Sequence, residues 1–234
     1  MLYVLWSAKG GVGTTVTAAM LASAMSSPPG ALLVDLAGDL ARAVGAPEPT
    51  AGVTELLAAL APATSPEAEA ALAAGPELIS RAEVGVAPGV GLLGRGAAGA
   101  PNPRGAERLA DLLTADPRAV VVDAGTLGRT TPPSAREEVA GTFLERAGSC
   151  LLVTRPCYLA LRATSTALST WPADGCILLT EKDRALKAAD VPAVLGIPVV
   201  AEVPVAARVA RSVDAGLLLQ RGDAASVRAL AGAT

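Results

Sequence analysis

A glycine-rich run near the amino terminus has the composition of a phosphate-binding loop. Glycines allow successive backbone N–H groups to turn toward one anion, and a helix that begins directly after them adds the positive end of its dipole. Thr15 stands where the hydroxyl of such a loop would ligate Mg²⁺. The residues of the run that we expect to bind a nucleotide polyphosphate with magnesium are Lys9, Gly10, Gly11, Val12, Gly13, Thr14 and Thr15.

Two aspartates that end apolar runs are candidates for the same site. Asp35 ends the run 31–35, and Asp123 ends the run 119–123 and is followed by Gly125. A carboxylate at either position can reach the hydration shell of Mg²⁺, and the N–H of Gly125 can sense a terminal phosphate. Each aspartate could instead only cap backbone amides of its own loop. We therefore predict Thr15, Asp35 and Asp123 as the metal-binding set.

The elements that must position these residues alternate between apolar runs and helical patterns. Continuous apolar runs indicate strands that are buried on both faces, and their alternation with helices indicates a doubly wound, mostly parallel α/β sheet flanked by helices. We expect one domain over residues 1–234. Ligands of such sheets bind beyond the carboxyl ends of the strands, where Gly10 and Asp35 both lie. The predicted strands are 2–6, 31–35, a strand within 84–93, 119–123, 151–155, 175–180 and 198–203.

Helical patterns fill most of the remaining chain. Ser134 followed by Glu137 has the spacing of a capping box at the start of one helix. The stretch 94–105 is rich in Gly, Pro and Ala and is predicted to be a loop. The predicted helices are 15–25, 40–44, 54–60, 66–74, 107–113, 134–146, one that includes 158–162, 209–219 and 224–230.

The glycine-rich run resembles the deviant Walker A loop, KGGxGK[ST], of the ParA/MinD family of dimeric ATPases. In that family the early lysine, here Lys9, reaches the nucleotide of the partner subunit. The lysine that cradles the bound phosphates is replaced here by Thr14. Among the members of the family, this combination most resembles the CpaE/TadZ branch, which is associated with positioning pilus-assembly and secretion machinery.

The resemblance extends to the two strand-end aspartates. Asp35 matches the first acidic residue of the family's second motif, but the second, which helps to position the attacking water, is Ala37. Asp39 follows two residues later, and it either substitutes or only caps the helix 40–44. Asp123 and Gly125 resemble a Walker B strand with its switch glycine, and residues 126–133 would then form a switch loop.

A third part of the resemblance concerns the base of the nucleotide. Pro204, followed by Val205, resembles the family's loop that packs against the adenine. Glu181 stands where many relatives have an asparagine that reads the base. The resemblance therefore implies a place for adenine without its usual polar reader.

Composition excludes several other classes of function. The net charge is −3, which provides no general attraction for a polyanion, so we do not expect DNA binding. Histidine is absent, and Cys150, Cys157 and Cys176 lack metal-binding spacing, so we expect buried or inert thiols in a cytoplasmic protein. No apolar stretch approaches the roughly 18 residues of a membrane span, and residues 227–234 lack a basic amphipathic pattern that would anchor to lipid.

Taken together, the residues and the resemblance predict an atypical ATP–Mg²⁺-binding protein. Without the Walker lysine and the second acidic residue, we expect weak or moderate binding and little or no hydrolysis. A homodimer across the nucleotide site would position or recruit an unidentified protein partner. Two alternatives are a nucleotide-free scaffold with a constitutive dimer and a slow but genuine ATPase of the partition type.

Overall fold

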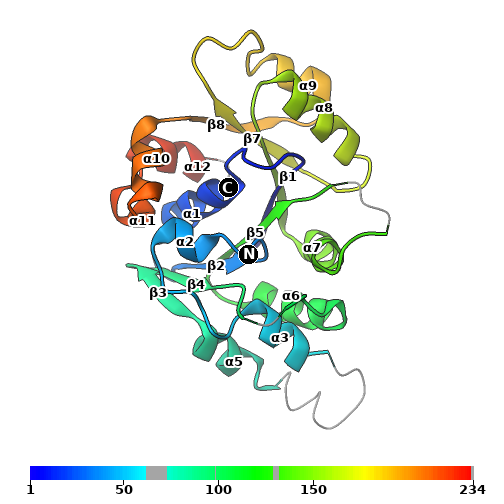
Figure 1. Ribbon diagram of the computed structural model, residues 1–234, viewed down its shortest axis with the longest axis vertical. Helices are drawn as coiled ribbons and strands as arrows, with labels where there is room; N and C mark the ends of the chain where they lie inside the picture. Colours follow the sequence, from blue (N-terminus) through cyan, green and yellow to red (C-terminus); the bar gives the residue numbers. More distant parts are fainter. Residues whose placement is uncertain (62–72, 98, 129–131, 233–234) are drawn as a thin grey trace.

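Eight strands form one sheet in a computed structural model that describes residues 1–61, 73–97, 99–128 and 132–232 (Figure 1). The order across the sheet is β3-β4-β2-β5-β1-β6-β7-β8. Every pair is parallel except β3 with β4. The predicted α/β class with a mostly parallel sheet is confirmed. The strands are β1 (Leu2–Ser7), β2 (Ala31–Asp35), β3 (Val84–Ala87), β4 (Val90–Leu93), β5 (Ala119–Thr126), β6 (Ser149–Thr154), β7 (Gly175–Thr180) and β8 (Val199–Pro204).

Helices cover both faces of this sheet (Figure 1). One face packs against α1, α2 and the carboxyl-terminal helices, and the other against α3, α6, α7 and α8. None of the described helices is both long and apolar enough to cross a bilayer. The helices are α1 (Thr14–Ala24), α2 (Leu40–Val44), α3 (Val53–Ala59), α5 (Gly75–Ala82), the 3₁₀ turn η1 (Pro103–Gly105), α6 (Ala106–Ala115), α7 (Ala135–Arg146), α8 (Tyr158–Ala167), α9 (Asp190–Leu195), α10 (Ala207–Asp214), α11 (Leu218–Arg221) and α12 (Ala224–Ala231).

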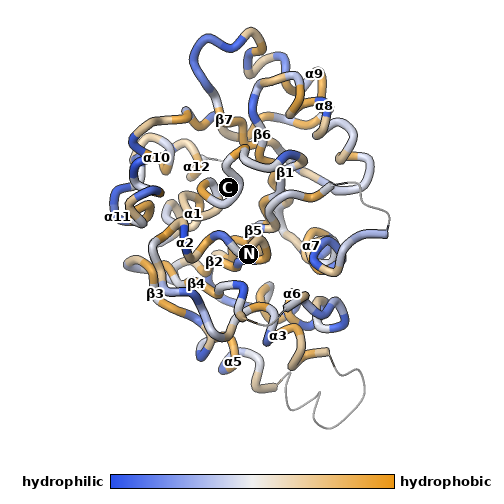
Figure 2. The backbone as a smooth tube through the Cα atoms, in the orientation of Figure 1, coloured by the Kyte–Doolittle hydropathy of each residue, from blue (hydrophilic) through white to orange (hydrophobic). Residues whose placement is uncertain are grey.

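The central strand β1 shows why the strands are apolar throughout. Leu2, Val4 and Trp6 belong to the core on one face, and Tyr3 and Leu5 belong to the core on the other. A strand that is covered on both faces needs apolar side chains at every position rather than at alternate ones. Figure 2 shows these hydrophobic segments in the middle of the molecule, with hydrophilic segments at the periphery, such as α10 and α11.

Several predicted elements need correction. The stretch 84–93 holds two antiparallel strands rather than one, because Gly89 with φ +71° turns the chain between them. The predicted helix 209–219 is divided into α10 and α11, because Gly216 adopts φ +66°. Helices α5 and α9 and the turn η1 were not predicted. The predicted helix 66–74 falls mainly on residues 62–72, which lie outside the described residues, as do residues 129–131 of the predicted switch loop.

The capping box at α7 is confirmed. The backbone N–H of Ser134 donates to Glu137 Oε2 at 2.9 Å, and the N–H of Glu137 donates to Ser134 Oγ at 3.3 Å. This reciprocal pair determines where α7 begins and thereby places the residues of its first turn.

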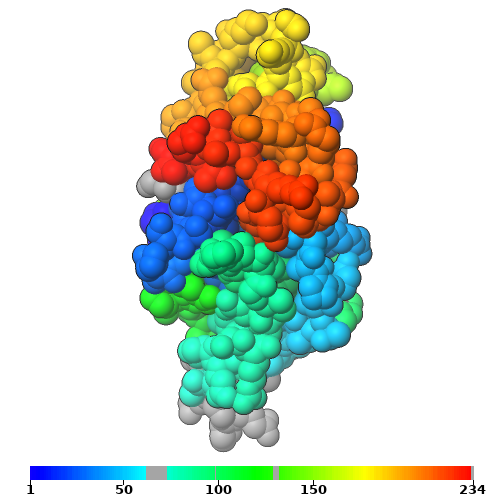
Figure 3. Space-filling view, turned by 90° about the vertical axis from the view of Figure 1, so that its left-hand side faces the viewer, coloured from blue at the N-terminus to red at the C-terminus, as the bar shows by residue number. Residues whose placement is uncertain are grey.

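The carboxyl-terminal helices cover the edge of the sheet near the hairpin of β3 and β4. Figure 3 shows α10 and α11 beside that hairpin and α2. Gln220 Nε2 donates to the carbonyl of Val86 in β3 at 3.4 Å.

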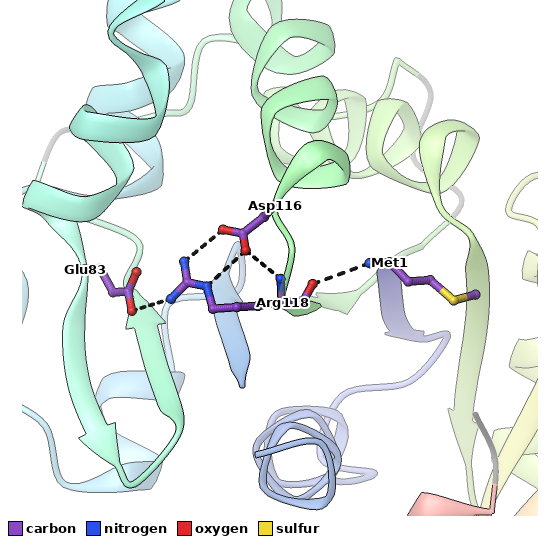
Figure 4. A network of polar contacts seen from close by, with 4 residues as sticks. All are labelled: Met1, Glu83, Asp116 and Arg118. Carbon is purple, nitrogen blue, oxygen red and sulfur yellow. Dashed lines mark hydrogen bonds and ion pairs between the residues drawn. The ribbon is translucent and has the colours of Figure 1, made fainter. Parts of the chain in front are cut away.

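Arg118, which directly precedes β5, links residues that directly precede two other strands, Glu83 before β3 and Met1 before β1 (Figure 4). Arg118 donates to both carboxylate oxygens of Asp116, at 3.0 and 2.8 Å, and to Glu83 at 2.7 Å. Its carbonyl accepts from the amino group of Met1 at 3.4 Å. Burial would raise the pKa of Asp116, but the hydrogen bonds and charge of Arg118 outweigh it and lower that pKa below its ordinary value.

We predict that Arg118→Met lowers the free energy of unfolding at pH 7 by about 1–3 kcal/mol, because two half-buried carboxylates lose their partner. The folded-state pKa of Asp116 is depressed, so its stabilisation is complete above the unfolded pKa and is lost as the pH falls through the folded pKa. The difference between the variant and the wild type should therefore shrink at pH 3. Urea unfolding of both proteins at pH 7 and at pH 3 measures this difference in the free energy of unfolding.

Arg81→Met is the matched control, because the ion pair of Arg81 with Glu77 is exposed and should contribute at most about 0.5 kcal/mol. An effect of Arg118→Met no larger than that of the control at pH 7 would contradict the assignment.

Candidate functional site

The glycine-rich loop joins β1 to α1 at the carboxyl edge of the sheet. Gly11 and Gly13 adopt φ +75° and +111°, which side chains rarely allow. Gly13 is the N-cap residue of α1, and no side chain of the described residues caps that helix. The first backbone N–H groups of a helix have no acceptor within it. This end of α1 therefore presents backbone N–H groups and a positive dipole end, which are groups that can bind an anion.

Three loops and one helix enclose a pocket of about 380 Å³ over this end of α1. The second loop, which follows β2, contributes Ala37 and Asp39, and the third, at the end of β5, contributes Gly125 and Thr126. Arg136 reaches the pocket from α7. The glycine-rich loop and the start of α1 contribute Gly10, Gly11, Gly13, Thr14, Thr15 and Val16.

Some of the predicted residues lie outside this pocket. Lys9 is exposed at the loop and does not line it. Val12 belongs to the core, and its carbonyl accepts from Arg155 Nε at 3.1 Å. Asp35 faces a neighbouring polar pocket, and Pro204 lies in an apolar one.

Asp123 lies buried beside the start of α1. Its Oδ1 accepts the N–H of Gly125 at 3.0 Å, whereas Oδ2 has no hydrogen-bond partner in the described part of the chain. Burial raises the pKa of Asp123 to about 7; the Thr15 hydroxyl beside it opposes this rise, and the charge of Asp35 adds to it. Asp35 is its in-register neighbour on β2, which explains that repulsion.

Asp35, rather than Asp39, caps the start of helix α2. Its two oxygens accept the N–H groups of Gly38 at 2.6 Å and Leu40 at 2.9 Å. The side chain of Asp39 caps nothing in α2. Burial raises the pKa of Asp35 more than these amides lower it. Of the two alternatives for Asp39, the cap of this helix is therefore wrong, because Asp35 reaches both amides.

Thr15 and Asp123 fit a magnesium ion that also takes phosphate oxygens. The described residues contain no group of three His, Cys, Asp or Glu side chains that could hold a metal ion alone. One hydroxyl beside one carboxylate with an unpartnered buried oxygen is a donor set suited to Mg²⁺, which completes its shell with water and phosphate.

A second, apolar pocket of about 260 Å³ adjoins Gly13. It is lined by Val16, Leu179, Val203 and Pro204, among other residues. Glu181 does not line it. This carboxylate pairs instead with Arg155 at 2.7 Å and with Arg184.

Sequence reasoning missed Arg136 and Arg155, which both contact the loops of the site. Arg136 carried one weak signal, since a cation in the first turn of α7 opposes the helix dipole, which favours acidic residues such as Glu137 and Glu138 there. Arg155 follows β6 directly and carried no signal of its own.

The architecture is that of P-loop ATPases of the ParA/MinD type. A ParA family ATPase from Chlorobium tepidum TLS is 19% identical, with 98% of this chain and 96% of that chain covered and a TM-score of 0.72. The septum site-determining protein MinD from Pyrococcus horikoshii OT3, complexed with Mg-ADP, is 17% identical, with 99% and 93% covered and a TM-score of 0.73. An ATP complex of a McdA variant from Cyanothece is 15% identical, with 100% and 95% covered and a TM-score of 0.63.

No family model matches the chain, and no curated protein sequence matches it. The likeness is thus one of fold, and the particular activity of this chain has to be argued from its own residues.

We predict that Gly125→Ala lowers the free energy of unfolding by about 2–3 kcal/mol. Gly125 has φ +68°, and an added Cβ would lie 2.9 Å from the Cβ of Ala37. The matched control is Gly11→Ala, since Gly11 has a similar φ of +75° with no atom within 4 Å of the added carbon, so strain alone should cost about 1 kcal/mol. Equal losses in urea unfolding would show that the contact with Ala37 is unimportant.

Proposed function

We propose that this chain binds ATP with Mg²⁺, weakly or moderately and with little or no hydrolysis, and acts as a nucleotide-linked dimer that positions or recruits a protein partner. The observation that carries the proposal is the pocket over the uncapped start of α1, where Thr15 lies beside the buried carboxylate of Asp123. Neighbours of the same fold in complex with Mg-ADP and with ATP support it.

The binding of phosphates is assigned to the loop amides and to the first turn of α1. The backbone N–H groups between Gly10 and Thr15 and the helix dipole provide fixed partial positive charge. Thr15 and Asp123 would hold the magnesium ion, which neutralises phosphate charge. Pro204 and the apolar pocket beside Gly13 offer a surface for a base.

Slow hydrolysis follows from two substitutions in the pocket. Thr14 places a neutral hydroxyl where the related loop has an ammonium group, and Ala37 places a methyl group where the related motif has a carboxylate. Charge-assisted hydrogen bonds are about twice as strong as neutral ones. Losing such a group from the transition state lowers a rate by roughly 10³-fold. Ground-state binding loses less, because the amides and the magnesium ion remain.

Association of two copies is proposed at the carboxyl edge of the sheet. Lys9 is exposed there, and its side chain makes no hydrogen bond or ion pair with any described residue. Tyr158 and Leu159, which begin α8 after β6, are 66% and 65% exposed. Apolar side chains with this exposure favour contact with a partner. Lys9 would then reach the nucleotide of the second copy, as in the related dimers.

The biological role is proposed from the fold neighbours and from the pattern of the loop. ParA, MinD, McdA and a plasmid partition protein share this fold, which favours a positioning role of the cell-division or partition type. The kept Lys9 with Thr14 favours the CpaE/TadZ-like branch and hence pilus or secretion assembly. The charge balance does not favour DNA as a partner.

Isothermal titration of the protein with ATP and MgCl₂ should show saturable binding with a dissociation constant between roughly micromolar and millimolar. Asp123→Asn should weaken the binding measured with Mg²⁺ about 10-fold, because it removes the carboxylate assigned to the metal shell. Asp111→Asn, at an exposed site on α6, makes the same chemical change and should have no effect. No heat at millimolar ATP would refute the nucleotide site.

Sedimentation velocity with and without ATP–Mg²⁺ separates the proposal from a constitutive scaffold. We expect dimer only with nucleotide, and Lys9→Ala should weaken it, whereas Lys182→Ala, at another exposed lysine, should not. The same dimer in both conditions would favour the nucleotide-free scaffold. Steady ATP turnover that falls in Lys9→Ala would favour the slow partition-type ATPase.

A further inference from the structure

We propose that Arg136 supplies, within one chain, the positive charge for bound phosphate that Thr14 does not provide. The inference rests on the proposed nucleotide site and assigns a further binding residue to it. Arg136 comes from α7, far along the chain from the glycine-rich loop, and lines the same pocket as Thr14 and Thr15.

The guanidinium of Arg136 is held at the end of β5 by two hydrogen bonds. Nη1 donates to the carbonyl of Ala124 at 2.6 Å, and Nη2 donates to the carbonyl of Thr126 at 2.6 Å. These carbonyls flank Gly125, whose N–H is bonded to Asp123. The capping box at Ser134 determines the start of α7 and so places Arg136. The guanidinium of Arg136 is therefore already held in position before any ligand binds.

These contacts leave the charge of Arg136 available. A guanidinium has five N–H donors, and neutral carbonyls occupy only two of them. Within the described ranges, Arg136 forms no ion pair, unlike Arg155, which is paired with Glu181. A planar guanidinium with free donors is well suited to phosphate oxygens.

The balance of charge in the pocket also requires a cation. Among the described residues that line it, Asp39 is the acidic one and Arg136 the basic one, while Lys9 lies outside. Asp35 and Asp123 lie close by and repel one another. Among the described residues that line the pocket, Arg136 is therefore the one cation available to a polyphosphate, besides the loop amides and the magnesium ion.

A structural role alone would also account for the two carbonyl contacts, so the test must separate charge from loop order. We would measure ATP–Mg²⁺ affinity by titration for Arg136→Met, Thr14→Lys and the double variant, and include Arg136→Lys as the charge-conserving change. Arg146→Met, at the other end of α7, is the matched control, because its ion pair with Asp111 is exposed.

We expect Arg136→Met to weaken binding about 10- to 100-fold, since a charged hydrogen-bond donor is lost. In the Thr14→Lys background, Arg136→Met should weaken ATP–Mg²⁺ binding at most about 3-fold, because the ammonium of the new lysine supplies the positive charge. Such non-additivity would show that the two positions share one function. The affinity of Arg136→Lys for ATP–Mg²⁺ should stay within about 5-fold of that of the wild type, because the charge is kept. The affinity of Arg146→Met should equal that of the wild type.

Equal losses in both backgrounds would show that Arg136 only orders the end of β5, and an unchanged affinity of Arg136→Met would show that it does not bind phosphate. Either result would overturn this inference and leave the proposed function standing. If the wild type does not bind ATP–Mg²⁺ but Thr14→Lys does, both the inference and the proposed function fail. Circular dichroism melting of each variant without nucleotide reports whether it is folded.

Discussion

The first backbone N–H groups of α1 have no acceptor within the helix, and Gly13 before them has no side chain to offer one. This unmet hydrogen-bonding capacity lies at the carboxyl edge of a parallel sheet, where three strand ends bring their loops together. The close approach of those loops depends on small residues, as the contact between Gly125 and Ala37 shows. The pocket is the space that these backbone constraints leave, and the anion binding that we propose would depend on them.

The charged side chains near the pocket add to the electrostatic effect of the backbone amides. Asp35 and Asp123 lie side by side on β2 and β5, but only Asp123 keeps a buried oxygen without a partner among the described residues, because Asp35 is occupied by two loop amides. The two carboxylates therefore have different roles: one orders its loop, and the other is available to a cation. In our proposal Arg136, which is held by the carbonyls on either side of Gly125, supplies a positive charge next to them.

The strands and the glycine-rich loop were predictable from sequence, because each is encoded locally. A strand that is buried on both faces must be a continuous apolar run, and a loop that turns amides inward must contain glycine. For Asp35 the sequence left two roles open, a magnesium ligand or a cap of its own loop amides, because only the path of the loop decides between them. Arg136 was missed because its position in the site depends on how α7 packs beside β5. The breaks at Gly89 and Gly216 were missed although each holds a glycine, one of them after Pro88, because a single glycine does not always end an element.

A crystal structure of the protein with a non-hydrolysable ATP analogue and Mg²⁺ would test the central claim most directly. We predict phosphate density against the amides of Gly11 to Thr15, with a metal ion beside the Thr15 hydroxyl and the Arg136 guanidinium facing a phosphate oxygen. A loop without ligand at saturating analogue, with its amides bonded to the protein's own groups, would contradict it.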